Sequence, residues 1–308
     1  MIAVPLAKKI AELFLILFAA AALVKTGILK AENSRILSKL SLYFITPCVI
    51  FNSFQKELTD EIGQGLLIAA ALAVGFELLF FLVAAVLRRV WKATEVERAS
   101  IVFCNVGNLV IPLVSFVLGP EWIIYTSAYV FVFNLLFWTV GIRMFDREIA
   151  PDFRKILLNP NLLAIWAGLV TLFTRLKLPE PIALAFSDVA AMIGPLSMMI
   201  TGMMIGGMTF RTIFSNHRVF GVIFFRMIFA SGLAVLAAAL LVRFLPVDRN
   251  IVKIVLLGAI APSASNINQV AILYNRDAGY ASSINVLTTL SCIVTIPLWT
   301  MLFETLIG

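Results

Sequence analysis

Ten stretches of mostly apolar residues fill nearly the whole sequence and leave only short connections between them. Hydrophobic residues make up 61% of the 308 residues and charged residues 13%, with a mean hydropathy of +1.02. A helix needs about 20 apolar residues to cross the hydrocarbon layer of a membrane. The sequence therefore predicts an all-α polytopic membrane protein with ten transmembrane helices, at about 7–27, 35–54, 62–87, 97–118, 122–143, 160–176, 185–209, 218–243, 251–274 and 279–303.

The distribution of basic residues predicts how the chain is oriented. Fifteen Lys and Arg residues fall at one end of the ten spans, eight at the other, and Arg226 inside a span. Short basic loops stay in the cytoplasm, so both termini are expected outside it, in a plasma (inner) membrane. The net charge of +7 is thus a topology signal, and no nucleic-acid partner is expected. The first stretch has no small-residue cleavage site behind it and is expected to remain as a span.

Catalytic and metal-binding patterns are missing from the sequence. Cys48, Cys104 and Cys292 lie in three different spans, and the one histidine, His217, lies in a loop. Neither a zinc site nor a histidine-based triad is expected from such a set. Nucleotide-binding and protease motifs are also absent from the sequence, so we predict no enzyme, no cofactor and no metal. The cysteines are expected to be small buried side chains.

The ten spans divide into two groups of five, residues 1–150 and 151–308. Because five is odd, the second group must enter the membrane from the opposite side, as in the inverted repeats of secondary transporters. Pro47 in the second span and Pro195 in the seventh occupy corresponding places. Polar residues also interrupt the fourth span, FCNVGNLVIPL, and its counterpart the ninth, IAPSASNINQVAILY. The pattern therefore favours two broken helices that cross near the middle of the membrane.

These two broken spans supply the candidate binding site. A proline within a span leaves backbone groups that hydrocarbon cannot satisfy, so they must face protein or water. Helix N-termini and neutral amides at such a crossing suit an anionic or zwitterionic solute. The alternative explanation is that the polar side chains only hydrogen-bond one helix to another and that the prolines only kink the helices. The predicted substrate-binding residues are Asn105, Asn108, Pro112, Asn134, Pro262, Ser263, Ser265, Asn266, Asn268, Gln269 and Asn285.

Two charged residues lie deep in predicted spans, at similar depths. A charge in the middle of a bilayer costs about 2.5–3.5 kcal/mol, so Glu77 and Arg226 are predicted to form an ion pair. This pair is either a static salt bridge or a carboxyl whose protonation is coupled to transport.

The motif NVGNLVIPL resembles the fourth-helix motif of the auxin efflux carrier family, which includes plant PIN proteins and bacterial permeases for malate and malonate. Asn105, Gly107 and Pro112 match it, whereas Asn108 and Val110 depart from it. LLNPNLLAIWAGL is similar to the start of the family's sixth helix. The stretch from Ala261 to Trp299 is similar to its ninth and tenth helices, through Pro262, Tyr274, Asp277, Ser291 and Pro297.

This resemblance implies a scaffold of helices 1, 2, 6 and 7 and a transport domain of helices 3–5 and 8–10 that moves as an elevator. It implies a small organic anion as substrate, either auxin-like or a dicarboxylate, and suggests a homodimer through the scaffold. Gly202 and Gly206 are then expected at a close scaffold contact. Coupling is expected to protons first, then to membrane potential alone, then to sodium. Sodium ranks last because neither crossing segment carries an acidic residue to help coordinate it. The alternatives are a sodium-coupled symporter and a ligand sensor or channel.

Overall fold

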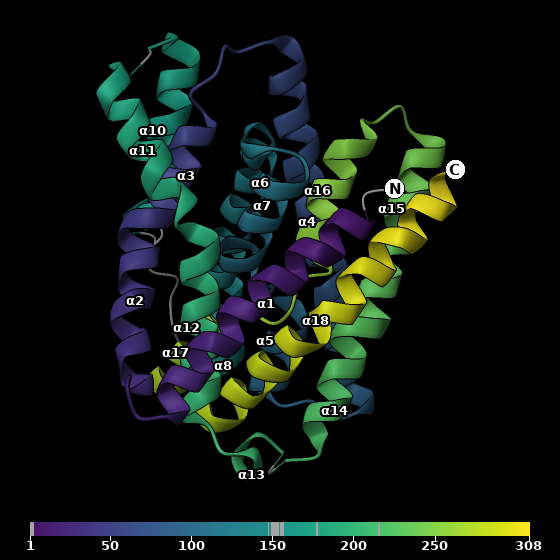
Figure 1. Cartoon of the computed structure of the whole chain (residues 1–308). Helices are drawn as coiled ribbons and strands as arrows, with labels where there is room; N and C mark the ends of the chain where they lie inside the picture. The colour runs from purple at the N-terminus through teal and green to yellow at the C-terminus, as the bar shows by residue number, and fades with distance from the viewer. Residues whose placement is uncertain (1–2, 147, 149–153, 155–156, 177, 215) are drawn as a thin grey trace.

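The computed structural model describes residues 3–146, 148, 154, 157–176, 178–214 and 216–308. Every helix or strand element in these residues is a helix (Figure 1). Six stretches are long and apolar enough to cross a membrane, and α10 is a shorter apolar helix. This agrees with the predicted all-α polytopic membrane protein. The six are Ala31–Ser53, Asp60–Val90, Pro120–Phe145, Glu180–Gly207, Arg218–Phe244 and Ala278–Ile307.

The first part of the chain contains eight α-helices, three of which are continued by a short π-helical turn. The π turns cover Ser41–Ile45, Val106–Val110 and Phe137–Gly141. The α-helices are α1 (Ala3–Lys25), α2 (Ser34–Leu40), α3 (Thr46–Ser53), α4 (Asp60–Val90), α5 (Glu95–Val102), α6 (Ile111–Val117), α7 (Ile123–Leu136) and α8 (Ile142–Phe145).

The second part has a similar series, with a seven-residue π turn at Phe224–Ala230. Its helices are α10 (Pro160–Thr174), α11 (Glu180–Ala191), α12 (Ile193–Gly207), α13 (Phe210–Ile213), α14 (Arg218–Ile223), α15 (Ser231–Phe244), α16 (Arg249–Ala259), α17 (Asn266–Leu273) and α18 (Ala278–Ile307). Figure 1 shows both termini at one end of the helical bundle and α13 at the other.

Polar capping residues mark the first turns of several helices. The Thr59 hydroxyl accepts a hydrogen bond from the Ile62 amide at the start of α4, and the Asp277 carboxylate accepts one from the Tyr280 amide at the start of α18. Thr94 and Glu97 form a reciprocal capping box at the start of α5. These caps satisfy amide donors that a helix leaves free at its first turn. The sequence around each loop therefore fixes where the following helix begins.

Two predicted spans are broken in the middle. The span at 97–118 is divided between α5 and the joined π turn and α6, and the span at 251–274 between α16 and α17. The extended residues between the halves meet in an antiparallel bridge of Cys104 with Ser263. The Asn105 amide donates to the Pro262 carbonyl at 2.8 Å, and the Ala264 amide to the Phe103 carbonyl at 3.0 Å. We call residues 103–105 and 262–264 the crossover.

Several pairs of helices pack closely along their lengths. α1 lies along α12, and α3 packs against α10 and α11. α4 packs against α5, α7 and α16, while α18 contacts α14, α15 and α17. A side chain on Gly202 would meet the Leu17 carbonyl, and one on Gly206 would come within 2.7 Å of the Ala21 carbonyl. The close contact predicted for these glycines is confirmed, between α12 and α1.

Candidate functional site

Side chains from α18 hold the backbone of the crossover. The Asn285 amide group donates to the Ser263 carbonyl at 2.7 Å, and the Ser263 amide donates to the Thr288 hydroxyl at 3.2 Å. Both side chains are buried. An extended segment inside a helical membrane protein needs such partners, because a single bridge between the two segments leaves other backbone groups that hydrocarbon cannot satisfy. Asn285 therefore acts as a support for the crossover.

The C-terminal ends of the two first half-helices converge on Arg226. Its guanidinium donates to the Ile101 carbonyl in the last turn of α5 at 3.1 Å and to the Ala259 carbonyl at the end of α16 at 2.8 Å. It also donates twice to the Ala261 carbonyl, at 2.7 and 3.1 Å, and lies 4.8 Å from the centre of the Phe80 ring. Helix C-termini carry partial negative charge, so one buried cation neutralises both ends.

The predicted ion pair between Glu77 and Arg226 does not form. Both side chains are fully buried, but the donors of Arg226 go to backbone carbonyls, and neither carboxyl oxygen of Glu77 has a hydrogen-bond partner among the described residues. The prediction overlooked the carbonyls at the ends of broken helices, which compete for a guanidinium. Glu77 still lies within electrostatic range of Arg226 and next to Tyr129.

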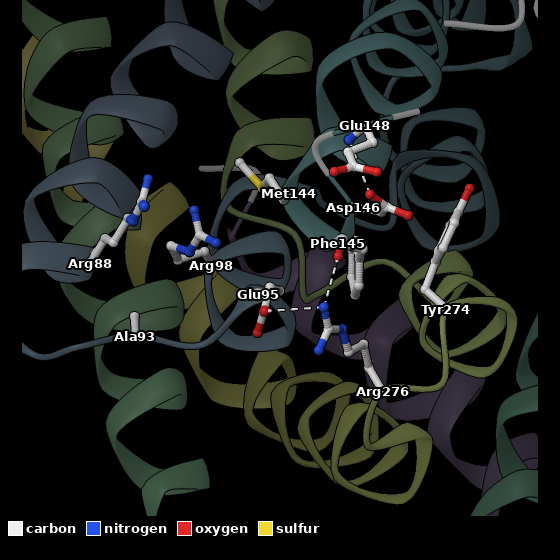
Figure 2. A pocket seen from close by; sticks show the side chains of 10 residues that line it. All are labelled: Arg88, Ala93, Glu95, Arg98, Met144, Phe145, Asp146, Glu148, Tyr274 and Arg276. Atoms are coloured by element: carbon white, nitrogen blue, oxygen red, sulfur yellow. Dashed lines mark hydrogen bonds and ion pairs between the residues drawn. The ribbon is translucent and has the colours of Figure 1, made fainter. Parts of the chain in front are cut away.

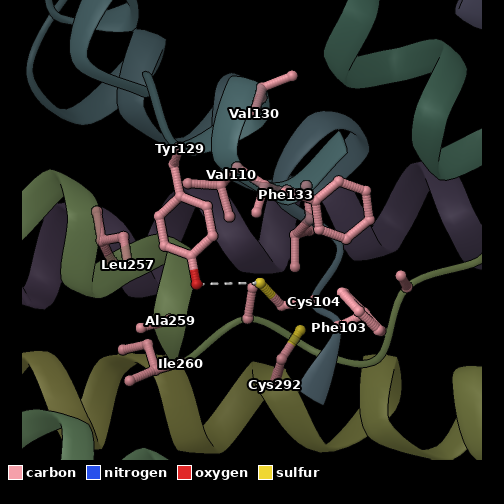
Figure 3. Close-up of a cluster of buried hydrophobic side chains, with 14 of the residues drawn as sticks. Phe103, Cys104, Val110, Tyr129, Val130, Phe133, Leu257, Ala259, Ile260 and Cys292 are labelled. Carbon is pink, nitrogen blue, oxygen red and sulfur yellow. Dashed lines mark hydrogen bonds between the residues drawn. The ribbon is translucent and has the colours of Figure 1, made fainter. Parts of the chain in front are cut away.

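An apolar core surrounds the back of the crossover (Figure 3). The Phe103 ring makes edge contacts with Phe81, Phe133 and Phe137, with centroids 5.0–5.8 Å apart. The Cys104 thiol lies 3.5 Å from the Tyr129 hydroxyl, as Figure 3 shows. All three cysteines are buried and free, which confirms the prediction made for them. This packing fixes the crossing segments, and Cys104 and Phe133 of this core also line the neighbouring cavity.

A cavity of about 80 Å³ lies beside the crossover. The starts of both second half-helices border it, through Val106 and Gly107 and through Ser265 and Asn266. Of the predicted site residues, those that line it are Asn105, Asn134, Ser265, Asn266 and Gln269. None of the described lining residues carries a formal charge. The cavity therefore offers amide groups and the partial positive charge of helix N-termini.

The remaining predicted residues are not in the cavity lining. Pro262 contributes its carbonyl to the crossover bridge, and the Ser263 side chain is buried with no partner for its hydroxyl among the described residues. Pro112 is buried within α6 close to Gly194, and Asn268 lies on α17 outside the lining. The side chain of Asn108 lies outside the described part of the structure.

Four polar lining residues were not among the predicted site residues. Thr46 precedes Pro47 in α3, Trp138 follows α7, and Asn159 and Asn161 flank the first residue of α10. The Asn159 amide group donates to the Asn134 carbonyl oxygen at 3.1 Å, which joins α10 to α7. The signal for the last two was in the sequence: NPN at the start of an apolar stretch places two amides at a helix start.

A larger cavity of about 640 Å³ lies at the ends of α4, α5, α8 and α17, away from the crossover (Figure 2). Its charged lining residues are balanced, three arginines against three carboxylates. Arg276 already has partners, because it donates a hydrogen bond to the Phe145 carbonyl at 3.0 Å and forms an ion pair with Glu95 at 3.5 Å. The smaller crossover cavity is the better candidate site, because broken helices, neutral amides and the starts of both second half-helices meet there.

The model of the family described as membrane transport protein matches residues 5–151. Over these residues, just under half of the chain, the sequence matches the membrane transport protein family, the family of the auxin efflux carriers. The resemblance noted in the sequence is thereby confirmed, and the match indicates a multi-pass membrane transporter. The match contains Asn105 and Asn134, whereas the second crossing segment, with Ser265 and Asn266, lies beyond it. No curated protein matches the chain.

Members of the membrane transport protein family are transporters and not enzymes, in agreement with the prediction of no enzymatic activity. The matched residues include the first crossing segment and α7, both of which contribute to the lining of the crossover cavity. The family match therefore covers one part of the cavity lining, and the rest of the lining lies beyond it.

Proposed function

We propose that this protein is a secondary transporter that carries small organic anions, carboxylates in particular, across the plasma (inner) membrane by alternating access around the crossover. Both termini lie outside the cytoplasm in this proposal, as the basic loops indicate.

One observation carries the proposal: the two helix N-termini at the crossover border a single uncharged cavity, while the two C-termini share Arg226. The arrangement separates partial positive charge on the cavity side from partial negative charge on the buried side. A carboxylate in the cavity would meet helix N-termini and the amides of Asn105 and Asn266, with no fixed cation to retain it. Such a site can bind an anion and release it again.

The architecture proposed for transport has ten spans in two inverted repeats, residues 1–150 and 151–308. The scaffold consists of α1, α2–α3, α10 and α11–α12, and the transport domain of the remaining helices. A cavity of about 80 Å³ is small beside the 300–1,000 Å³ typical of ligand pockets, so we infer that the two groups must separate before substrate enters. An elevator movement of the transport domain would open the cavity on alternate sides.

Protons are the coupling ion in this proposal, and Glu77 is the group that carries them. Its carboxyl is fully buried and lacks a hydrogen-bond partner among the described residues, beside Tyr129 and within range of Arg226. A carboxyl in such a place can exist neutral or charged, depending on what occupies the neighbouring cavity.

The test is uptake of a panel of labelled carboxylic acids into proteoliposomes that contain the purified full chain. Proton gradients, sodium gradients and membrane potential are imposed separately. The proposal expects saturable uptake of at least one acid, stimulated by a proton gradient. Uptake of none of the acids above protein-free liposomes would overturn the assignment of substrate class.

A further inference from the structure

Two buried polar atoms in the wall of the crossover cavity have no hydrogen-bond partner among the described residues. They are the indole nitrogen of Trp138, just beyond α7, and the side-chain oxygen of Asn161 in the first turn of α10. Both residues line the cavity, and the Asn161 side chain is only 7% exposed. Buried polar atoms in folded proteins are nearly always paired, so two unpaired atoms in residues that line one cavity call for an explanation.

The neighbouring amides of the same wall are fully engaged. The Asn159 side chain donates to the Asn134 oxygen at 3.1 Å and accepts from the Asn161 backbone amide at 2.9 Å. The Asn134 side chain donates in turn to the Val130 carbonyl at 2.8 Å. The wall is therefore ordered by its own hydrogen bonds, and the two orphan atoms are left over for something that enters the cavity.

We propose that Trp138 and Asn161 form a second subsite that recognises a hydroxyl group of the transported acid. This inference rests on the proposed function, because it takes the carboxylate to lie at the crossover amides. An indole N–H acts only as a hydrogen-bond donor, and an amide oxygen acts only as an acceptor. A hydroxyl group satisfies both at once. A second carboxylate would satisfy Trp138 but place two acceptors together at Asn161.

The size of the cavity limits the distance between the two groups of the substrate. Asn105 and Asn266 of the crossover border the same space of about 80 Å³ as Trp138 and Asn161. A hydroxyl and a carboxylate that reach both walls of so small a space are only a few bonds apart. The ligand class is therefore a short-chain 2-hydroxy or 3-hydroxy monocarboxylate.

Competition in proteoliposomes tests the subsite directly. Uptake of labelled 2-hydroxypropanoate is measured against unlabelled 2-hydroxypropanoate, 3-hydroxypropanoate, propanoate and malonate. Loss of paired hydrogen bonds at a buried site weakens binding by about tenfold or more, so one hydroxy acid should compete at least about tenfold better than propanoate. Trp138→Phe and Asn161→Leu should each reduce this ratio severalfold and leave competition by propanoate unchanged. Trp166→Phe, on the exposed side of α10, is the matched control and should keep the wild-type ratio.

The outcomes separate this inference from the proposed function. Three outcomes would overturn the hydroxyl subsite while carboxylate transport stands. Propanoate and both hydroxy acids could compete equally well, malonate could compete best, or the ratio could be unchanged in both variants. Absence of uptake for every acid would overturn the proposed function and the subsite with it. The ratio of competitors does not depend on how much protein folds, and Trp138→Phe alone suffices if Asn161→Leu is not recovered.

Discussion

Arg226 illustrates, at the scale of one residue, how a buried charge can be held without a counter-ion. Its fork-shaped guanidinium reaches three carbonyls at once, which a lysine ammonium on a flexible stem does not match. The three carbonyls are those that α5 and α16 leave free at the crossover. The residue is therefore a structural part of the crossover.

Replacement of Arg226 by Gln should destabilise the protein strongly. Three buried carbonyls would lose charge-assisted partners, which predicts a loss of about 3 kcal/mol or more in the free energy of unfolding. Heating the detergent-solubilised protein and following the monodisperse fraction by size-exclusion chromatography measures the effect. Arg243→Gln, at an exposed position, is the control and should melt like the wild type. Equal melting temperatures for both variants would show that the carbonyls need no cation.

Glu77→Gln should remove the dependence of uptake on a proton gradient and leave the folded fraction little changed. The amide has the size of the carboxyl but does not titrate, and no hydrogen bond of the carboxyl is lost. Initial uptake rates across a series of external pH values, at fixed membrane potential, measure this. Glu32→Gln, at an exposed position in the short 3-10 helix Ala31–Asn33, serves as the control. A wild-type pH profile for Glu77→Gln would instead assign the carboxyl a purely structural role.

At this scale the sequence predicts only part of the cavity lining. Asn105, Ser265, Asn266 and Gln269 line the cavity, because breaks in an apolar span are visible in the sequence, whereas four other predicted residues in the described part of the crossing segments do not. NPN indicates a helix start at Asn161, but no local pattern connects that helix, or Trp138, to the crossover. Long-range packing brings them there, and the same packing decides that Arg226 binds carbonyls and not Glu77.

The contact between α1 and α12 matters at the scale of whole helices. The small residues of α12 let the two helices approach until backbone touches backbone, as in other close helix pairs of membrane proteins. This part of the fold follows from the sequence, since glycines four residues apart in an apolar stretch predict a packing face. Which helix lies against that face depends on the tertiary fold.

Gly202→Ala should destabilise this pair. The added methyl group would collide with the Leu17 carbonyl, and backbone cannot yield as a flexible side chain does. Overpacking of this kind lowers the free energy of unfolding by about 1–3 kcal/mol, and a lower melting temperature measures the loss. Gly75→Ala in α4 is the matched control, because its methyl group would meet nothing within 4 Å, and it should melt no earlier than the wild type. Identical melting of the two variants would contradict the close contact.

At the scale of the whole molecule, transport requires the proposed scaffold and transport groups to move past each other. The hydrogen bond from Asn159 to Asn134 spans that boundary beside the cavity. The paired variant Asn134→Cys/Asn159→Cys, joined by a short thiol-reactive cross-linker, should lose nearly all uptake. Each single cysteine variant treated with the same reagent is the control and should keep most of its uptake. Full uptake by the cross-linked pair would rule out movement at this boundary.

The all-helical, membrane-spanning character of the chain follows largely from composition and loop length, because a bilayer admits few alternatives. The proposed division of the bundle into two moving groups does not follow from them, since it depends on which contacts break during transport. The central claim, that the carboxylate binds at the crossover, is tested most directly by Asn105→Ala and Asn266→Ala. Saturable uptake of the best carboxylic acid into proteoliposomes should show a KM raised about tenfold or more in each variant. Unchanged saturable uptake in both variants would contradict the account.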